Sequence, residues 1–253
     1  MVAVAGDFDY ERGGQAYATV RRTDPRIAAL VHGALGPART VLNVGAGAGS
    51  YEPADRYVVA VEPSATMRAQ RPAGAVPALQ GVAEQLPFDD GSFDAAMATL
   101  TVHQWPDMRA GLAEMRRVTR GPVVVLTFDG DALDRFWLAD YVPELIEAER
   151  RRYPDPTVIG QVLGAGATVR AVRVARDCLD GFTEAYFARP EAFLDEATRR
   201  SQSAWGFLDD GVEDRFVEHL RADLESGAWD ARYGSLRDQE SFEGALRLVV
   251  QGG

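Results

Sequence analysis

Three alternating glycines follow a short apolar run early in the chain. Gly45, Gly47 and Gly49 come directly after the run 41–44, which is typical of a buried strand in a parallel sheet. Glycine allows a tight turn and lets a ligand approach the backbone closely. We therefore expect a ligand at the carboxyl end of this strand, where open α/β sheets bind their ligands.

An acid and a histidine follow two later predicted strands, where each could act on such a ligand. Glu62 ends the β-branched run 57–61, and a carboxylate there can accept hydrogen bonds from both hydroxyls of a ribose. His103 follows the predicted strand 94–100 and is one of three histidines in the chain. A histidine at this edge could position a substrate or act as a general base.

The elements that would position these groups alternate between strand and helix. This alternation indicates an α/β fold with a doubly wound, mostly parallel sheet and helices on both faces. The link between Gly49 and the run 57–61 is too short for a full helix, so we expect a stunted first crossover. Further strands are expected at 76–81, 121–128, 167–175 and 245–250, and helices at 24–35 and 107–118.

The second half of the chain departs from this alternation. Residues 131–152 indicate a helix with a kink at Pro143, and Pro156 indicates the start of another helix. About sixty residues then separate the sixth predicted strand from the seventh. They contain predicted helices around 190–205 and 210–224 and many aromatic residues, which suit a lid over a planar or apolar substrate.

Taken together, these motifs resemble those of the class I S-adenosylmethionine-dependent methyltransferases, in particular their small-molecule branch. The resemblance rests on Val44-Gly-Ala-Gly-Ala-Gly49, on Glu62-Pro-Ser-Ala-Thr-Met67, and on the segments 83–88 and 93–103. It implies a Rossmann-like methyltransferase fold of seven strands, into which the insertion before the last strand adds a helical lid. The expected division is an arm closing over the cofactor at 1–36, the cofactor-binding core at 37–178, the lid at 179–240 and the final strand at 241–253.

The resemblance also implies S-adenosylmethionine as the cofactor and a set of site residues. Tyr17 and Arg21 lie one helical turn apart, and their counterparts in similar enzymes reach the cofactor's carboxylate. The expected cofactor-binding residues are Tyr17, Arg21, Gly45, Ala46, Gly47, Glu62, Pro63, Met67, Ala83, Glu84, Thr99 and Leu100. The expected substrate-binding residues are Tyr10, Trp105, Phe128, Trp137 and Tyr186, and His103 is the catalytic candidate.

Composition narrows the range of partners. The formal net charge is −11, so the chain lacks the basic footprint that a nucleic-acid-binding protein needs. We therefore expect a small-molecule substrate. The single Cys178 fits a reducing cytoplasm, no apolar run is long enough to span a membrane, and no spacing of ligand residues predicts a metal site.

Three functions remain open at this point. The favoured one is methyl transfer to an O, N or C nucleophile of a small, aromatic or apolar metabolite, by in-line displacement at the sulfonium methyl. A nucleotide-dependent oxidoreductase is the second, although the pattern G-x-G-x-x-G is absent. The third is a non-catalytic protein that binds the cofactor on the same fold. The sequence does not predict the oligomeric state.

Overall fold

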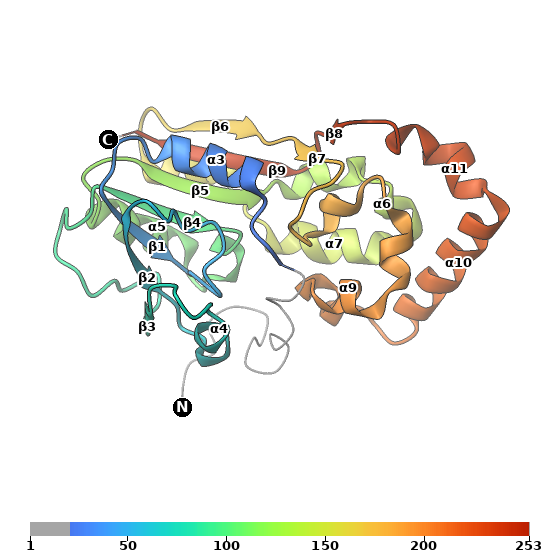
Figure 1. The fold of residues 1–253 in the computed structure, drawn as a ribbon, viewed down its shortest axis with the longest axis horizontal. Helices are drawn as coiled ribbons and strands as arrows, with labels where there is room; N and C mark the ends of the chain where they lie inside the picture. Colours follow the sequence, from blue (N-terminus) through green and yellow to red (C-terminus); the bar gives the residue numbers. More distant parts are fainter. Residues whose placement is uncertain (1–20, 253) are drawn as a thin grey trace.

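A seven-stranded sheet forms the centre of the computed structural model, which describes residues 21–252 (Figure 1). Its strand order is β3-β2-β1-β4-β5-β9-β6. The first five strands in this order are parallel, and β9 runs antiparallel to both β5 and β6. The strands are β1 (Thr40–Val44), β2 (Tyr57–Val61), β3 (Ala78–Leu79), β4 (Ala95–Thr99), β5 (Val123–Phe128), β6 (Thr168–Ala171) and β9 (Leu246–Gln251). The predicted fold class is thus confirmed.

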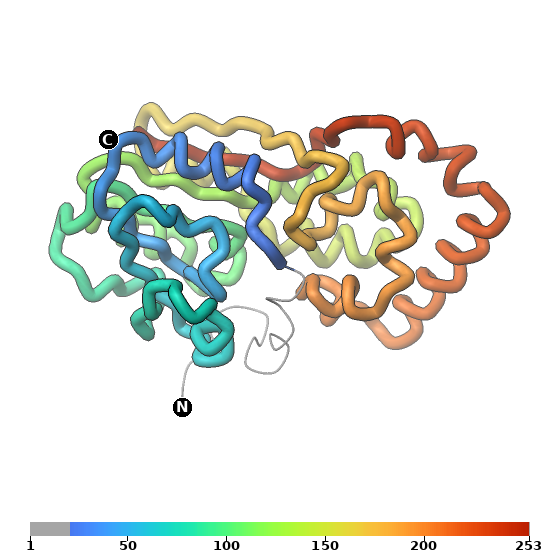
Figure 2. Tube along the Cα trace, viewed as in Figure 1, coloured from blue at the N-terminus to red at the C-terminus, as the bar shows by residue number. Residues whose placement is uncertain are grey.

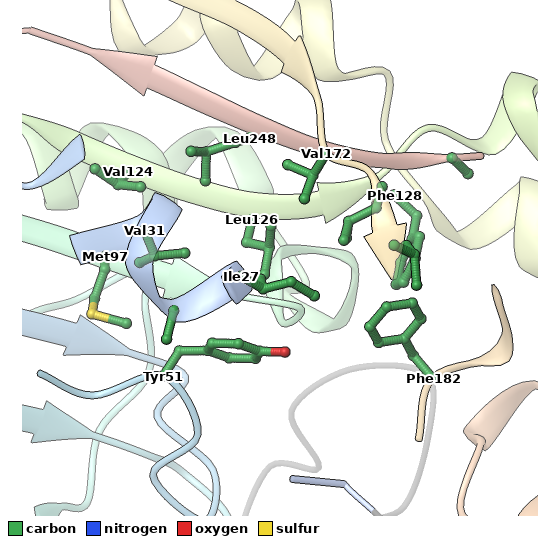
Figure 3. Packing of buried hydrophobic residues seen from close by; sticks show 14 of the residues in the cluster. Ile27, Val31, Tyr51, Met97, Val124, Leu126, Phe128, Val172, Phe182 and Leu248 are labelled. Atoms are coloured by element: carbon green, nitrogen blue, oxygen red, sulfur yellow. The ribbon is translucent and has the colours of Figure 1, made fainter. Parts of the chain in front are cut away.

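Helices cover both faces of this sheet, because its central strands carry apolar side chains on both sides. All six residues of β5 are buried, as parallel sheets between two helical layers require. Helix α3 (Pro25–Ala34) packs on one face, and α5 (Met108–Arg117) and α8 (Pro156–Leu163) pack on the other. Figure 3 shows Ile27 and Val31 of α3 packed together with Leu126 of β5 and Leu248 of β9.

The first crossover is stunted, as the sequence predicts. No helix forms in residues 45–56, between β1 and β2. Tyr51 fills part of this place: it has a positive φ of 64°, and its ring is buried beneath α3 (Figure 3). The next crossover carries only the short helix α4 (Ala65–Ala69), which begins at an N-cap hydrogen bond from Met67 N–H to Ser64 Oγ.

A second lobe lies beside the sheet and is built mainly from the insertion before β9 (Figure 2). Its own core is aromatic and includes Trp137, Phe193 and Trp229. The antiparallel pair of β7 (Val174–Ala175) and β8 (Ser241–Phe242) closes the base of the insertion. The helices of this half are α6 (Leu138–Tyr141), α7 (Pro143–Arg152), α9 (Glu196–Arg200), α10 (Val212–Ser226) and α11 (Ala228–Tyr233). The 3₁₀ helices are η1 (Val102–Gln104), η2 (Gly130–Arg135), η3 (Thr183–Tyr186), η4 (Pro190–Leu194), η5 (Ser203–Phe207) and η6 (Gly234–Leu236).

Three sequence-based expectations for this half were wrong in detail. Pro143 does not kink a helix but begins α7, because the first helical position needs no N–H from proline. The predicted strand 167–175 divides into β6 and β7, since the chain leaves the main sheet after Ala171 and pairs with β8 instead. Helix α11 was not predicted; it follows directly after Gly227, whose left-handed conformation ends α10.

Candidate active site

The glycine loop turns sharply where β1 ends. Gly45, Gly47 and Gly49 have φ values of 66°, 51° and 95°, which favour glycine over any residue with a side chain. A methyl group at Gly45 would also lie 2.2 Å from Thr101 Oγ1. The amides of Gly45 and Ala46 both donate to the Val61 carbonyl, at 2.9 and 3.0 Å. These contacts fix the loop against the end of β2 and keep its backbone open to a ligand.

The Glu62 side chain holds this loop from β2. One carboxylate oxygen accepts a hydrogen bond from Gly47 N–H at 2.8 Å, and the other accepts one from Ser64 N–H at 2.9 Å. Only 7% of the residue is exposed, and this burial raises the pKa of Glu62 against the effect of the two hydrogen bonds. A carboxylate has about four acceptor positions, so both oxygens retain capacity for ribose hydroxyls.

A buried ion pair braces the loop in the place of the missing crossover helix. Arg71 Nη2 contacts both carboxylate oxygens of Glu52, at 2.7 and 2.8 Å. Asn43 Nδ2 donates to the same carboxylate at 3.0 Å, and Arg71 Nη1 donates to the Gly47 carbonyl at 3.3 Å. The pair therefore connects β1, the stunted crossover and the segment after α4. The sequence analysis missed it because its members are far apart in the chain.

Several other expected cofactor residues also lie at this edge of the sheet. Met67 is buried, and its Cε would be 3.3 Å from a methyl group at Gly47. Pro63 follows Glu62, and its carbonyl accepts a hydrogen bond from Arg68. Thr99 ends β4, and Leu100, which follows it, has the unusual φ of 55° for a residue with a side chain. The register of parallel strands brings these residues close to the glycine loop.

Ala83 and Glu84 lie beyond the end of β3, beside the start of α5. Ala83 is buried, and Glu84 Oε1 accepts a hydrogen bond from Asp107 N–H at 3.1 Å. Trp105 packs on this region as well, because a methyl group at Gly111 of α5 would lie 2.6 Å from its ring. Trp105 therefore packs against α5, and it does not line the cleft described next.

A cleft opens beside the ends of β4 and β5, beneath the second lobe. One wall is apolar and includes Leu100 and the edge-to-face pair Phe128 and Phe182, whose ring centroids are 5.4 Å apart. The other wall is polar. The lining residues are Arg21, Leu100, His103, Phe128, Leu133, Glu149, Tyr153, Phe182, Thr183, Glu184, Gln202 and Ser203. Two predicted substrate or catalytic residues, Phe128 and His103, thus lie together in one site.

His103 lies in this cleft as a neutral ring. Its imidazole packs edge-on against Tyr153, with ring centroids 4.7 Å apart. Burial, together with the positive charges of Arg152 and Arg21, holds the pKa of His103 well below its usual value. A neutral imidazole can accept a proton, which is what the predicted role of general base requires. That role remains a prediction.

Arg21 reaches the cleft but forms a buried ion pair. Its Nε lies 2.6 Å from Asp180 Oδ1, and Tyr51 Oη donates to Asp180 Oδ2 at 2.7 Å. Asp180 is 2% exposed. This triad joins the stunted crossover to the insertion. Tyr10 and Tyr17 lie outside the described residues, so the pairing of Tyr17 and Arg21 with the cofactor's carboxylate stays a prediction.

Two buried acids in the cleft were missed by the sequence analysis. Glu149 is 5% exposed and Glu184 is fully buried. Burial raises the pKa of Glu149 to about 7, although the positive charge of Arg152 opposes the rise. Burial likewise raises the pKa of Glu184 to about 7, against a hydrogen bond from Ala245 N–H. The signal was present for Glu149, which follows Leu145 by four residues and so shares the buried face of α7.

Trp137 and Tyr186 do not belong to the lining of this cleft. The Trp137 ring is 3% exposed in the core of the second lobe, and its Nε1 donates to the Phe187 carbonyl at 3.1 Å. The Tyr186 ring packs edge-on against Phe193 and beneath the guanidinium of Arg189. Both rings therefore pack inside the lobe, and their contact with a substrate stays a prediction.

Neither a metal cluster nor a membrane span is found in residues 21–252. No group of three or more His, Cys, Asp or Glu side chains there could hold a metal ion. No helix in the same range is long and apolar enough to cross a membrane. Cys178 is a buried free thiol.

Residues 42–127 match the model of a protein family described as a methyltransferase domain. A crystal structure of a protein from Anabaena variabilis, provisionally named a methyltransferase of an antibiotic biosynthesis pathway, is similar over nearly the whole fold. It is 29% identical, with a TM-score of 0.86, over 92% of this chain and 98% of that one. A provisionally named histamine N-methyltransferase from Thermotoga maritima, 17% identical with a TM-score of 0.52 over 96% of this chain and 91% of its own, shares the fold.

Curated sequence relatives match a shorter part of the chain. A demethylmenaquinone methyltransferase from Mycolicibacterium gilvum is 39% identical over 100 residues, which are 37% of this chain and 44% of that protein. The match thus spans less than half of the relative's length. The family model over residues 42–127, the shared fold and these relatives together support a class I S-adenosylmethionine-dependent methyltransferase.

Proposed function

We propose that this class I methyltransferase transfers the methyl group of S-adenosylmethionine to an O, N or C nucleophile of a small molecule held in the cleft. One observation carries the proposal: Leu100, an expected cofactor contact at the end of β4, also lines the cleft. Two sites that share one residue would bring the sulfonium and an acceptor side by side. Close alignment of the two reactants is most of what this reaction requires.

The residues at the sheet edge fit the cofactor. The positive φ angles of Gly45 and Gly47 form the turn that lets a ligand approach the backbone, and Glu62 keeps acceptor capacity for ribose hydroxyls. When bound, S-adenosylmethionine supplies an activated methyl group. The chain's own residues would orient it, exclude water at the apolar wall of Leu100 and Phe128, and offer neutral His103 as a proton acceptor.

The relatives' names offer a second acceptor chemistry. Several are called demethylmenaquinone methyltransferase or quinone-biosynthesis C-methyltransferase, so a quinone ring carbon is the second candidate for the acceptor. These matches cover at most 37% of this chain, whereas the cleft is lined partly by the insertion. A demethylated quinone should therefore be tested as an acceptor for this protein.

Calorimetric titration with S-adenosylmethionine and with S-adenosylhomocysteine tests the proposal. We expect the wild type to bind both with micromolar affinity. In Glu62→Ala the affinity should fall at least about tenfold, because the change removes one or more charge-assisted hydrogen bonds to the ribose. Asp55→Ala is the control, because the Asp55 side chain is 78% exposed. No binding by the wild type would refute the proposal, and binding of NADH in its place would revive the oxidoreductase.

A further inference from the structure

Three polar side chains from distant segments meet in the cleft. Glu149 comes from α7, Thr183 begins η3, and Gln202 precedes η5. Thr183 Oγ1 lies 2.9 Å from Gln202 Oε1 and 3.4 Å from Glu149 Oε1. The carboxyl group and the amide are therefore joined through a single hydroxyl, and both belong to the lining of the cleft.

Gln202 offers a hydrogen-bond donor to the cleft. The residue is 5% exposed, and its Oε1 accepts from Thr183 Oγ1 and from Trp205 Nε1, the latter at 3.3 Å. An indole N–H can only donate, so this contact fixes which end of the amide is oxygen. Among the residues that the structure describes, Nε2 has no hydrogen-bond partner. Native proteins rarely leave a buried donor unsatisfied, and Gln202 belongs to the lining of the cleft, so a hydrogen-bond acceptor bound there could satisfy Nε2.

Glu149 offers the complementary acceptor. The charged groups that act on it are the guanidiniums of Arg152 and Arg21, and Glu184 is the neighbouring acid. Near neutral pH this carboxyl can hold a proton or receive one, because its pKa is raised to about 7 by burial. The aromatic faces of Phe128 and Phe182 line the same cleft.

We infer that Gln202 and Glu149 form the acceptor subsite, and that it takes a phenolic or enolic hydroxyl. The hydroxyl oxygen accepts a hydrogen bond from Gln202 Nε2, and its proton points to the Glu149 carboxylate. One hydroxyl satisfies both groups, whereas an ammonium offers no lone pair to Gln202. The inference rests on the proposed methyl transfer and identifies its substrate class.

The chemistry balances with the groups named. A lone pair of the hydroxyl oxygen forms the bond to the methyl carbon as the carbon–sulfur bond breaks, and sulfur keeps that electron pair as a neutral thioether. The hydroxyl proton moves to the Glu149 carboxylate and later to water. The products are a methyl ether, S-adenosylhomocysteine and one proton.

Binding of phenol and of its methyl ether, methoxybenzene, tests the subsite. Each compound is titrated into protein saturated with S-adenosylhomocysteine and followed by ligand-observed NMR. We expect the wild type to bind phenol about tenfold more tightly than methoxybenzene, because the ether cannot donate a hydrogen bond. In Glu149→Leu this preference should fall to about twofold or less, whereas Gln202→Leu should weaken the binding of both compounds, because either oxygen can accept from Nε2.

Controls separate the subsite from the fold and from the cofactor. Glu147→Leu, on the exposed side of α7, should keep the full preference for phenol. Equal binding of the two compounds by the wild type, absence of phenol binding, tighter binding of aniline than of phenol, or a preference that survives in Glu149→Leu would each overturn the inference. Failure to bind S-adenosylhomocysteine would instead count against the proposed function, and the phenol preference can then be measured without it.

Discussion

The glycine loop and the acceptor cleft are built in opposite ways. The loop is a continuous backbone segment that Glu62, Arg71 and Glu52 hold from nearby. The polar wall of the cleft is assembled from side chains on α7, on η3 and just before η5. The first site depends on backbone geometry that few residues allow. The second depends on ordinary residues that only the folded chain brings together.

This difference separates what the two sites can tolerate. A backbone site fails when any side chain enters it, because neither the strained φ angle nor the filled space can relax. A side-chain site can lose one contact and keep the others. We therefore expect the steepest losses at the loop, intermediate effects at the buried acids, and the smallest effects at the contacts between the two regions.

The largest effect should come from Gly45→Ala. The new methyl group would lie 2.2 Å from Thr101 Oγ1, so the loop or the Thr101 side chain, which follows β4, would have to move. We expect S-adenosylhomocysteine affinity to fall by roughly a hundredfold or more, equivalent to about 2.7 kcal/mol, measured by calorimetry. Gly36→Ala is a matched control, because Gly36 has a similar φ of 60° but open space around it. An equal loss of affinity in both variants would contradict the account of the loop.

The buried acids should make stability depend on pH. Glu149 and Glu184 have pKa values raised to about 7 in the folded state, so the folded protein binds more protons than the unfolded chain between about pH 4.5 and pH 7. Their contribution is present below about pH 4.5 and is lost as the pH rises through 7.

Chemical denaturation of wild type and Glu149→Leu at pH 5 and pH 8 measures this contribution. The variant should gain stability relative to the wild type at pH 8, because it no longer buries a charge. Asp24 contributes in the opposite direction. Burial raises its pKa, but hydrogen bonds such as those from Arg26 lower it by more, so the pKa lies below its ordinary value. Its contribution to the free energy of unfolding is therefore lost at acidic pH. Because Asp24 is common to both proteins, a difference that does not change with pH would refute the assignment.

The smallest effect should come from Tyr51→Phe. This change removes the hydrogen bond from the stunted crossover to Asp180 in the insertion, at a cost of about 1–2 kcal/mol in the free energy of unfolding. Tyr57→Phe is the control, because Tyr57 is 69% exposed and its change should stay within about 0.5 kcal/mol. Equal stability of the two variants in urea would show that the two regions are not joined through this contact.

The predictability of the molecule follows the same division. The central strands could be predicted because β5 and its neighbours are continuous apolar runs. The glycine loop could be predicted because its glycines directly follow such a run. The stunted crossover could be predicted from the few residues between Gly49 and the run 57–61 alone. The split of 167–175 into β6 and β7 could not, because it depends on pairing with β8, more than sixty residues further along the chain.

The residues of the cleft were predicted least well, because most of them are brought together only by the fold. His103 and Phe128 directly follow or end predicted strands, so their place could be inferred. Glu149 lies on the apolar face of α7, four residues after Leu145, whereas Gln202 carries no local pattern that distinguishes it from a surface residue. Trp137 was expected at the substrate because it is aromatic, but an aromatic ring packs equally well inside a lobe, and the sequence does not record which choice the fold makes.

The position of β9 has a consequence for how the chain folds during synthesis. In the described sheet, β6 pairs with β9, which lies between it and β5. A ribosome makes β6 first and then the whole insertion before β9 emerges. Until then one edge of the apolar strand β5 has no partner, and such an edge is a template for pairing with other chains. The aromatic core of the second lobe is complete only at Phe242, just before β9 begins at Leu246, so the lobe and the sheet are completed almost together.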